Sequence, residues 1–392
     1  MVPIRRPPVA TYVVAATSAR SADAGAVVAV VLAAAARTDY PAFAAGLLAA
    51  GITAPHVGAP LLAHRLDAAR DSRRNLSGAF ACYAAVSLAV AATIGWWPWW
   101  VELGLVAVVG AAGPLVTGGM SSLLAALVPA DDHSQARAQG WDAVTYGVAG
   151  AGGPAAVGLV AALWSPLAGL LVVAALVGVA AALVWALPAQ RSAPQESLLP
   201  VRAALGTVVC TGPLRRVALI TMTASLVTSV VTVLAVLLGA STGVHGALLV
   251  TVFGVGNLLA SFLVTARPST GEPERRVLRW VLVLAAAFAG AAVAPSSWWT
   301  VAAFLLAGAS TAPYSTATLA ARSRYSPPEL RAMVFVSMAG VKTAAGSLGS
   351  ALAGILAGLG FRTSLAMSAG VLVISVVAAG LDLRRSPAAD DS

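Results

Sequence analysis

Two oppositely charged residues lie inside the first long apolar stretch of the chain. Arg20 and Asp23 are three positions apart in the run 11–36, so they share one face if that run is a helix. A charge near the middle of a bilayer costs about 2.5–3.5 kcal/mol on insertion scales, so it usually has a partner or a function. Two interpretations are open. The pair neutralises itself and packs the helix, or Asp23 exchanges a proton while Arg20 tunes it or holds an anion.

Other polar groups stand alone in apolar stretches. Lys342 lies about ten residues into the run 332–358, too deep to reach the membrane edge easily. It is either half of a structural ion pair or a functional cation. His56 and Asn257 are likewise either structural or part of a proton or substrate path. Asp142, near one end of its apolar run, is expected to have access to water.

Hydroxyl side chains recur at helical spacing in four of the apolar runs. Such stripes either line a polar cavity or form hydrogen bonds between helices. The clearest stripes are at 221–232 and 311–318, and a shorter one follows the Gly113-Pro114 pair. The cavity-lining candidates are Thr17, Thr117, Ser121, Thr221, Ser225, Thr228, Thr232, Thr311, Tyr314, Ser315 and Thr318.

The sequence holds little that could support catalysis or bind a metal. Its four histidines are isolated, and its two cysteines, Cys82 and Cys210, show no metal-ligand spacing and no disulfide framework. The Gly-x-x-x-x-Gly-Lys-Ser/Thr loop that cradles nucleotide phosphates does not occur. We therefore expect no enzyme activity, no metal and no cofactor.

The composition indicates a protein whose solvent is lipid. Of the 392 residues, 59% are hydrophobic and only 10% are charged, against about 25% in soluble domains. The net charge of +9 comes from basic residues in short clusters between apolar runs, which argues against a nucleic-acid partner. All but one of these basic residues are arginine. That bias suggests a bacterial source, and hence a bacterial cytoplasmic (plasma) membrane.

Twelve apolar runs are long enough to cross a bilayer as helices of about 20 residues. The clearest, 166–187, has no charged residue, and the second run is interrupted by Pro55, His56 and Pro60. We expect an all-α membrane protein with helices at 11–36, 40–63, 78–96, 101–128, 139–163, 166–187, 214–239, 246–266, 278–295, 298–320, 332–358 and 363–382.

Basic residues are concentrated in every second connection between the apolar runs, and this pattern predicts the membrane topology. With the N-terminus placed inside, the inner segments contain 20 of the 24 basic residues, and the outer segments contain only Arg37 and Arg362. Arginine and lysine favour the cytoplasmic side of a membrane. Both termini are therefore expected in the cytoplasm, with the tryptophan-rich turn at 96–100 on the outer side.

The chain divides into two similar halves. The longest segment without a span follows six apolar runs and precedes six. Residues 118–163 and 308–359 have the same order: a small-residue helix, a loop with proline and an acidic residue that ends in arginine, and a Gly-rich helix. We expect an N-terminal six-helix bundle, a cytoplasmic linker and a C-terminal six-helix bundle, over 1–187, 188–213 and 214–392.

In these features the chain resembles the major facilitator superfamily. The family's fifth-span motif, Gly-x-x-x-Gly-Pro-x-x-Gly-Gly, is partly kept, with alanine and valine at two of its glycine positions. The Gly-Pro pair and the final glycine are kept as Gly153, Pro154 and Gly158, and Gly150 follows the alanine at the first glycine position. The family's loop after span two is Gly-x-x-x-Asp-Arg-x-Gly-Arg-Arg. This chain aligns cleanly with that loop only at Arg65, and His64 stands at the position of the family's Asp. The gating-loop candidates are His64, Arg65 and Asp67.

The resemblance implies a secondary transporter that moves a small molecule by alternating access, with spans one, four, seven and ten around the substrate. The Gly-Pro motif favours export, and Asp23 favours proton coupling, so a proton-driven antiporter is the leading hypothesis. An uptake carrier for a sugar or organic anion is the alternative, and an intramembrane enzyme is a distant third. The expected partners are the small-molecule substrate, protons and the bilayer, and the expected oligomeric state is a monomer.

The topology can be tested with reporter tags. Tags at residues 195, 270 and 390 are expected to report the cytoplasm, and tags at 98 and 243 the outer side, because the arginine clusters alternate in that register. An external signal from the tag at 270 would contradict the twelve-span count.

Overall fold

The fold was analysed in a computed structural model that describes residues 8–37, 39–58, 71–129, 132–189, 201–266, 271–327 and 330–385. Helices make up nearly all of this part of the chain, and no β-strand is found within it. The helices fall into two compact units that divide between Glu196 and Ser197. Each unit is described by itself below.

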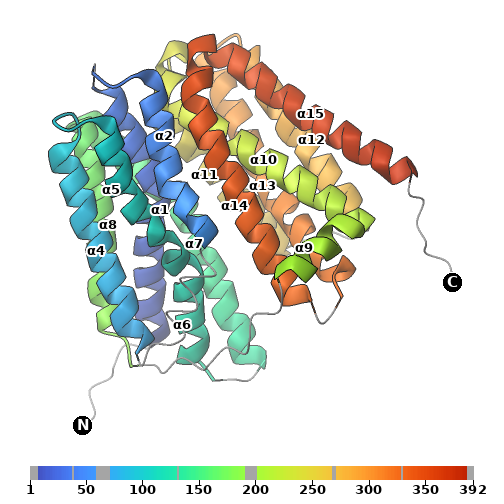
Figure 1. Ribbon diagram of the computed structural model, residues 1–392, viewed down its shortest axis with the longest axis horizontal. Helices are drawn as coiled ribbons and strands as arrows, with labels where there is room; N and C mark the ends of the chain where they lie inside the picture. The colour runs from blue at the N-terminus through green and yellow to red at the C-terminus, as the bar shows by residue number, and fades with distance from the viewer. Residues whose placement is uncertain are drawn as a thin grey trace. The chain divides into compact units, whose positions relative to one another are not determined.

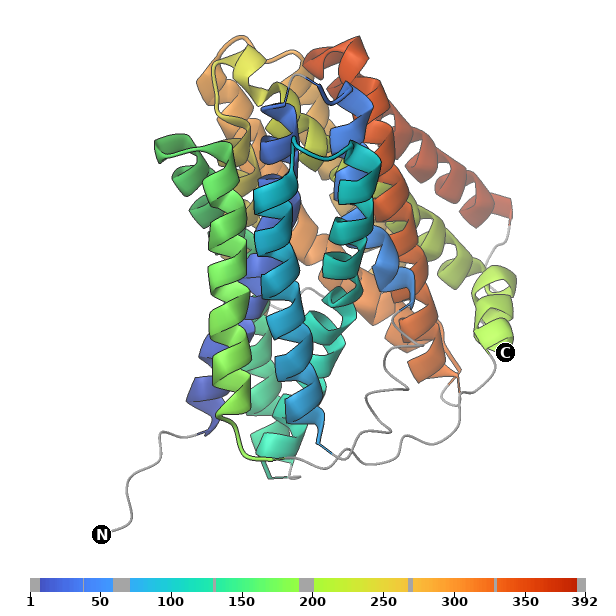
Figure 2. The ribbon, with the colours of Figure 1, turned by 60° about the vertical axis from the view of Figure 1, so that its left-hand side comes forward.

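The first unit is built around its first helix. Its elements are α1 (Pro8–Ala35), α2 (Ala42–Thr53), the 3₁₀ helix η1 (Ala54–Gly58), α4 (Ser72–Thr93), α5 (Trp99–Ala111), the π-helix η2 (Leu115–Gly119), α6 (Met120–Leu127), α7 (Asp132–Leu163) and α8 (Pro166–Trp185). Helix α1 packs against both α7 and α8, α4 packs along α8, and α2 packs against α5 (Figures 1 and 2).

The second unit repeats these pairings. It contains α9 (Val201–Cys210), α10 (Gly212–Leu238), η3 (Gly239–Thr242), α11 (Gly246–Ala266), α12 (Pro273–Ala292), α13 (Ser297–Tyr325), α14 (Arg331–Leu356), η4 (Ala357–Leu359) and α15 (Phe361–Arg385). Helix α10 packs against α14 and α15, while α13 packs against α11 and α12 (Figure 1).

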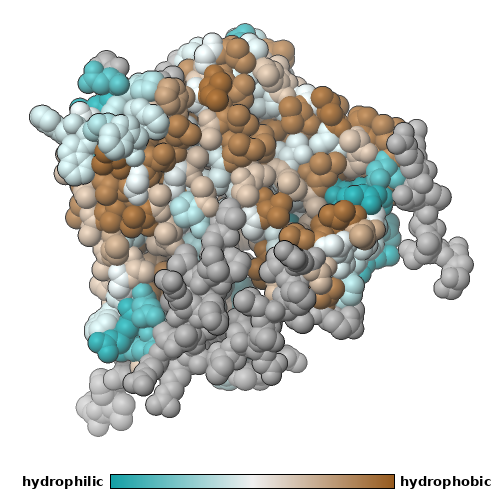
Figure 3. Space-filling view, in the orientation of Figure 1, coloured by the Kyte–Doolittle hydropathy of each residue, from teal (hydrophilic) through white to brown (hydrophobic). Residues whose placement is uncertain are grey.

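Within the described residues, each of the twelve predicted apolar runs contains helix, so the all-α membrane fold class is confirmed. Among the described residues, eight helical segments are long and apolar enough to cross a membrane. Large apolar side chains lie on the outside of the helices; Leu263, Ile355 and Ile374 are each at least 60% exposed. Apolar residues also spread widely over the face shown in Figure 3. An outer surface of this kind requires lipid as its solvent, because in water it would drive aggregation.

The run 101–128 is divided near Gly113-Pro114, as the sequence indicated, and continues as the π-helix η2 before α6 begins. One helix was not expected: the segment 188–213, predicted as a linker, contains α9. With α10 and α14, α9 borders a cavity of about 260 Å³ with a mainly apolar lining that includes Leu205, Met222 and Met338.

Glycines allow the paired helices to approach closely. A Cβ atom on Gly153 of α7 would lie 2.2 Å from the carbonyl oxygen of Ser21 on α1. The equivalent contact in the second unit is between Gly349 of α14 and the carbonyl oxygen of Leu226 on α10, at 2.1 Å. Real Cβ atoms do not approach an oxygen so closely, so both positions require glycine. Close backbone approach at small residues is the usual way in which membrane helices associate.

In the region of the predicted Gly-Pro motif, Gly153 is in tight contact with α1, whereas Gly150 has open space beside it. Substitution of each glycine tests this difference. Gly153→Ala is expected to lower the stability by about 1–3 kcal/mol, because the added methyl group overpacks the α1–α7 contact. Gly150→Ala is the matched control, since no atom lies within 4 Å of its added Cβ. It is expected to be neutral or stabilising by up to ~1 kcal/mol through helix propensity. Thermal unfolding in detergent measures both, and equal shifts for the two variants would contradict the close approach.

Candidate functional site

A buried arginine connects three helical segments of the first unit. Arg20 of α1 is only 3% exposed. Its Nη1 donates to Asp142 Oδ1 at 2.7 Å and to the Thr145 hydroxyl on α7. Its Nη2 donates to Ser121 Oγ on α6 at 3.0 Å. The guanidinium also lies 3.6 Å from the ring centroid of Tyr146, within the range of a cation–π interaction.

The irregular part of span four supplies further acceptors for the same arginine. Arg20 Nε donates to the carbonyl oxygen of Val116 and Nη2 to that of Thr117, each at 3.4 Å. Both carbonyls belong to the π-helix η2. π-Helical turns are rare and concentrate at functional sites. The break that begins at Gly113-Pro114 therefore brings backbone oxygens to the buried cation.

Asp142 is the true partner of Arg20, which corrects the pairing expected from the sequence. The carboxylate also accepts hydrogen bonds from Tyr12 at 2.5 Å and from Ser121 at 2.7 Å. Its side chain is 14% exposed, so the expected access to water is small. The spacing of Arg20 and Asp23 was misleading, because the long arginine side chain reaches across to α7 and not along its own helix.

Asp23 instead faces His56. Its Oδ2 lies 4.0 Å from His56 Nε2 on η1, beyond direct hydrogen-bond distance. The other polar atom of each side chain, Asp23 Oδ1 and His56 Nδ1, is buried and makes no hydrogen bond. Gly113 makes room for the imidazole, because a Cβ there would lie 1.8 Å from Nε2. Two separately predicted residues are thus brought together beside the break in span four.

The predicted hydroxyls are largely engaged with helix backbones. Thr117, Thr221, Thr232 and Thr318 each donate to a carbonyl oxygen of their own helix. Thr311 donates to its own helix and also to Asn257 Oδ1 at 2.8 Å. Asn257 therefore joins α11 to α13. The cavity-lining role of this set, which also includes Thr17, Ser225, Thr228 and Ser315, stays a prediction.

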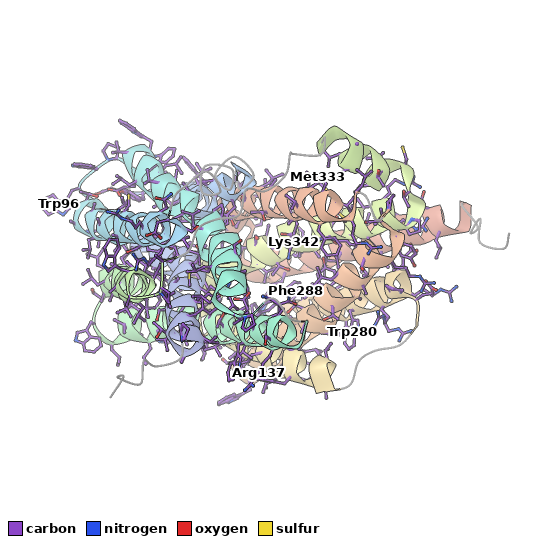
Figure 4. The ribbon with its side chains drawn as sticks, turned by 90° about the horizontal axis from the view of Figure 1, so that it is seen from below. Trp96, Arg137, Trp280, Phe288, Met333 and Lys342 are labelled. Carbon is purple, nitrogen blue, oxygen red and sulfur yellow. The ribbon has the colours of Figure 1, made fainter. Side chains whose placement is uncertain are left out.

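The other residues selected from the sequence are Lys342, the gating-loop candidates and the rest of the Gly-Pro motif. Lys342 on α14 makes no ion pair within the described part of the chain, so its expected structural partner is not found. Figure 4 shows its place on the helix. His64, Arg65 and Asp67 lie outside the described residues, and their gating role stays a prediction. Gly158 and Pro154 lie within α7.

Sequence reasoning missed a second ionic cluster. Arg216 on α10 is 4% exposed and pairs with Glu274 on α12 and, at 3.0 Å, with Asp382 on α15. Arg215 makes two 2.8 Å hydrogen bonds to the same Asp382. Every carboxylate of this cluster is matched by an arginine. The cluster therefore ties three helices together and leaves no net charge exposed for a ligand.

Comparison with known proteins identifies the fold. No family model and no curated protein matches the chain. Solved structures do match over nearly all of it. A mutant of the nucleoside transporter NupG aligns with a TM-score of 0.76 and 12% identity, over 96% of this chain and 99% of that one. A POT family transporter in complex with a thioalcohol-conjugated peptide aligns with 0.74 and 9%, over 97% and 96%.

A third structure supports the same conclusion. A bacterial homologue of the human lysosomal transporter Spinster aligns with a TM-score of 0.70 and 15% identity, over 97% of this chain and 98% of that one. At these identities the likeness concerns the fold. The chain has the all-α, multi-pass membrane fold of major facilitator transporters, as its sequence predicted.

The Arg20–Asp142 pair can be tested through stability. Asp142→Asn is expected to cost about 3 kcal/mol, because it leaves a buried guanidinium without its counter-charge. The double variant Arg20→Met with Asp142→Asn is expected to recover part of that loss. Asp39→Asn, at an exposed position, is the matched control and should change stability by less than about 0.5 kcal/mol. Thermal unfolding in detergent reports all three, and a double variant no more stable than Asp142→Asn would argue against the pair.

Proposed function

We propose that this protein is a proton-coupled secondary transporter, which moves a small molecule across the membrane by alternating access. The observation that carries the proposal is the Asp23–His56 pair. Two titratable side chains face each other across 4.0 Å, each with a buried polar atom that lacks a hydrogen bond. Polar groups in this state are costly inside a membrane protein and usually have a function.

The geometry of the pair suits a proton carrier. At this separation the two groups can exist as an ion pair or as a neutral acid beside a neutral imidazole. Which form is favoured depends on distance and on access to water. Asp23 belongs to α1 and His56 to η1 at the end of α2, so a small relative movement of these elements changes the balance. Proton binding and conformation are thereby linked.

The Arg20–Asp142 network is not suited to that role. Its carboxylate accepts hydrogen bonds from Arg20, Tyr12 and Ser121, so protonating it would disrupt a satisfied arrangement. The network holds α1, η2 and α7 together while the neighbouring pair changes state. It also occupies Arg20, which is therefore not available to bind an anionic substrate as the sequence had suggested.

Export is the direction that the Gly-Pro motif favours, and we propose it as the leading direction. The motif's Gly153 forms the close α1–α7 contact, so the helix that carries Arg20 and Asp23 is packed directly against it. The alternation of arginines supports a plasma-membrane location with both termini in the cytoplasm. Uptake of an organic anion is the second candidate, because Arg322 and Lys342 of the second unit make no ion pair within the described residues.

Coupling can be measured in reconstituted vesicles that contain a pH-sensitive dye. A panel of dipeptides, nucleosides and organic acids is added, and the solutes that cause a proton flux with the wild-type protein are carried forward. Asp23→Asn is expected to abolish accumulation driven by a pH gradient while it keeps exchange of labelled for unlabelled solute, because exchange needs no net proton movement. His56→Gln is expected to weaken the gradient-driven transport.

Asp39→Asn serves as the control in the same assay, since it makes the same chemical change at an exposed position. It should retain full gradient-driven transport. A well-folded Asp23→Asn protein that still accumulates solute as the wild type does would exclude Asp23 as the coupling group.

A further inference from the structure

The second unit contains a buried cation that has no counter-charge among the described residues. Arg322 on α13 is only 5% exposed, its Nε makes no hydrogen bond, and no ion pair involves it within the described residues. A buried, unpaired guanidinium is strongly unfavourable. The position in the last helical turn of α13 offsets this through the helix dipole, which is a much weaker effect.

The surroundings of Arg322 are those of an anion site. Lys342 lies on α14, which contacts α13, and it makes no ion pair within the described residues either, which adds to the excess of positive charge. Lys342 is exposed, so a ligand can reach it. Tyr314 lies two turns before Arg322 on the same helix, is 6% exposed, and its hydroxyl is buried without a hydrogen bond.

This half of the chain has few carboxylates that could neutralise Arg322 or Lys342. Between Val201 and Arg385 the sequence has four acidic residues, Glu272, Glu274, Glu329 and Asp382. Glu274 and Asp382 pair with the Arg215–Arg216 cluster. Glu272 pairs with Arg324 and accepts a hydrogen bond from Tyr325. Glu329 lies outside the described residues. None of the three described carboxylates neutralises Arg322 or Lys342.

We infer that Arg322, Lys342 and Tyr314 form a binding site for the carboxylate or phosphate group of a small, soluble organic anion. The guanidinium supplies paired N–H donors that match such a group, the ammonium adds charge, and the phenol adds one O–H donor. The binding site does not depend on the proposed transport function. Only the statement that the bound anion is the transported substrate rests on it.

Binding can be tested on the full-length chain in detergent. Its thermal unfolding is followed by tryptophan fluorescence while succinate or inorganic phosphate is titrated, with ionic strength held constant by sodium chloride and with glucose as the neutral control. Wild type is expected to gain thermal stability with succinate or phosphate and not with glucose. Arg322→Gln and Lys342→Met are each expected to weaken the apparent affinity about tenfold or more. Tyr314→Phe is expected to weaken it about two- to tenfold.

Arg324→Gln is the matched control, since Arg324 lies on the same helix but is exposed and pairs with Glu272 at 3.0 Å. It should bind the anions as the wild type does. Without ligand, Arg322→Gln should melt at a higher temperature than the wild type, because it removes an unpaired buried charge. A lower melting temperature, or equal loss of binding in Arg324→Gln and Arg322→Gln, would overturn the inference.

Three further outcomes separate the possible sources of the anion, and the anion site from the proposed transport function. Stabilisation by phosphatidylglycerol but by neither soluble anion would mean a lipid headgroup site and would overturn the inference of a soluble cargo. If vesicles show proton flux with neutral solutes only, and the detergent titration shows no anion binding, the anion site fails and the proposed transport function stands. If the anions bind through Arg322 but no solute moves protons, the site stands and the proposed transport function fails.

Discussion

The organisation of the first unit depends on the ion pair between Arg20 and Asp142. A guanidinium inside a membrane protein is stable only if its charge and its donors are satisfied. Here a carboxylate, two hydroxyls, three backbone carbonyls and an aromatic ring provide that environment. These groups come from α7, η2 and α6, so the arginine can be satisfied only when the segments are assembled around α1. That requirement also explains why the fourth span is irregular at this depth.

The two units share a packing plan but differ in their charges. Glycine contacts join α1 to α7 and α10 to α14 in the same way. In the first unit the buried arginine is neutralised within the protein, whereas in the second Arg322 and Lys342 have no partner among the described residues. Helix packing tolerates only small residues at the contacts, while the polar positions between them are free to diverge. A duplicated scaffold can therefore hold a proton-sensitive pair in one half and a site of excess positive charge in the other.

The sequence predicted the helices well, because apolar length and charge alternation are local properties that the bilayer enforces. It also indicated the break near Gly113-Pro114. It failed on the partner of Arg20, because Asp142 lies 122 positions away and only the tertiary fold brings the two together. Asp23 and His56 were each selected for being polar in an apolar run, yet nothing local linked them. Helix α9 was missed because ten residues within a Pro- and Arg-rich segment are too short to register as a span.

The two cysteines also differ in where the fold places them. Cys82 lies on α4 in the first unit and Cys210 at the end of α9 in the second, and both are exposed and free. The protein thus carries one free, exposed thiol in each compact unit without any substitution. Spin labels or fluorophores attached to this native pair would measure the distance between the two units, and any change of that distance when a solute is added.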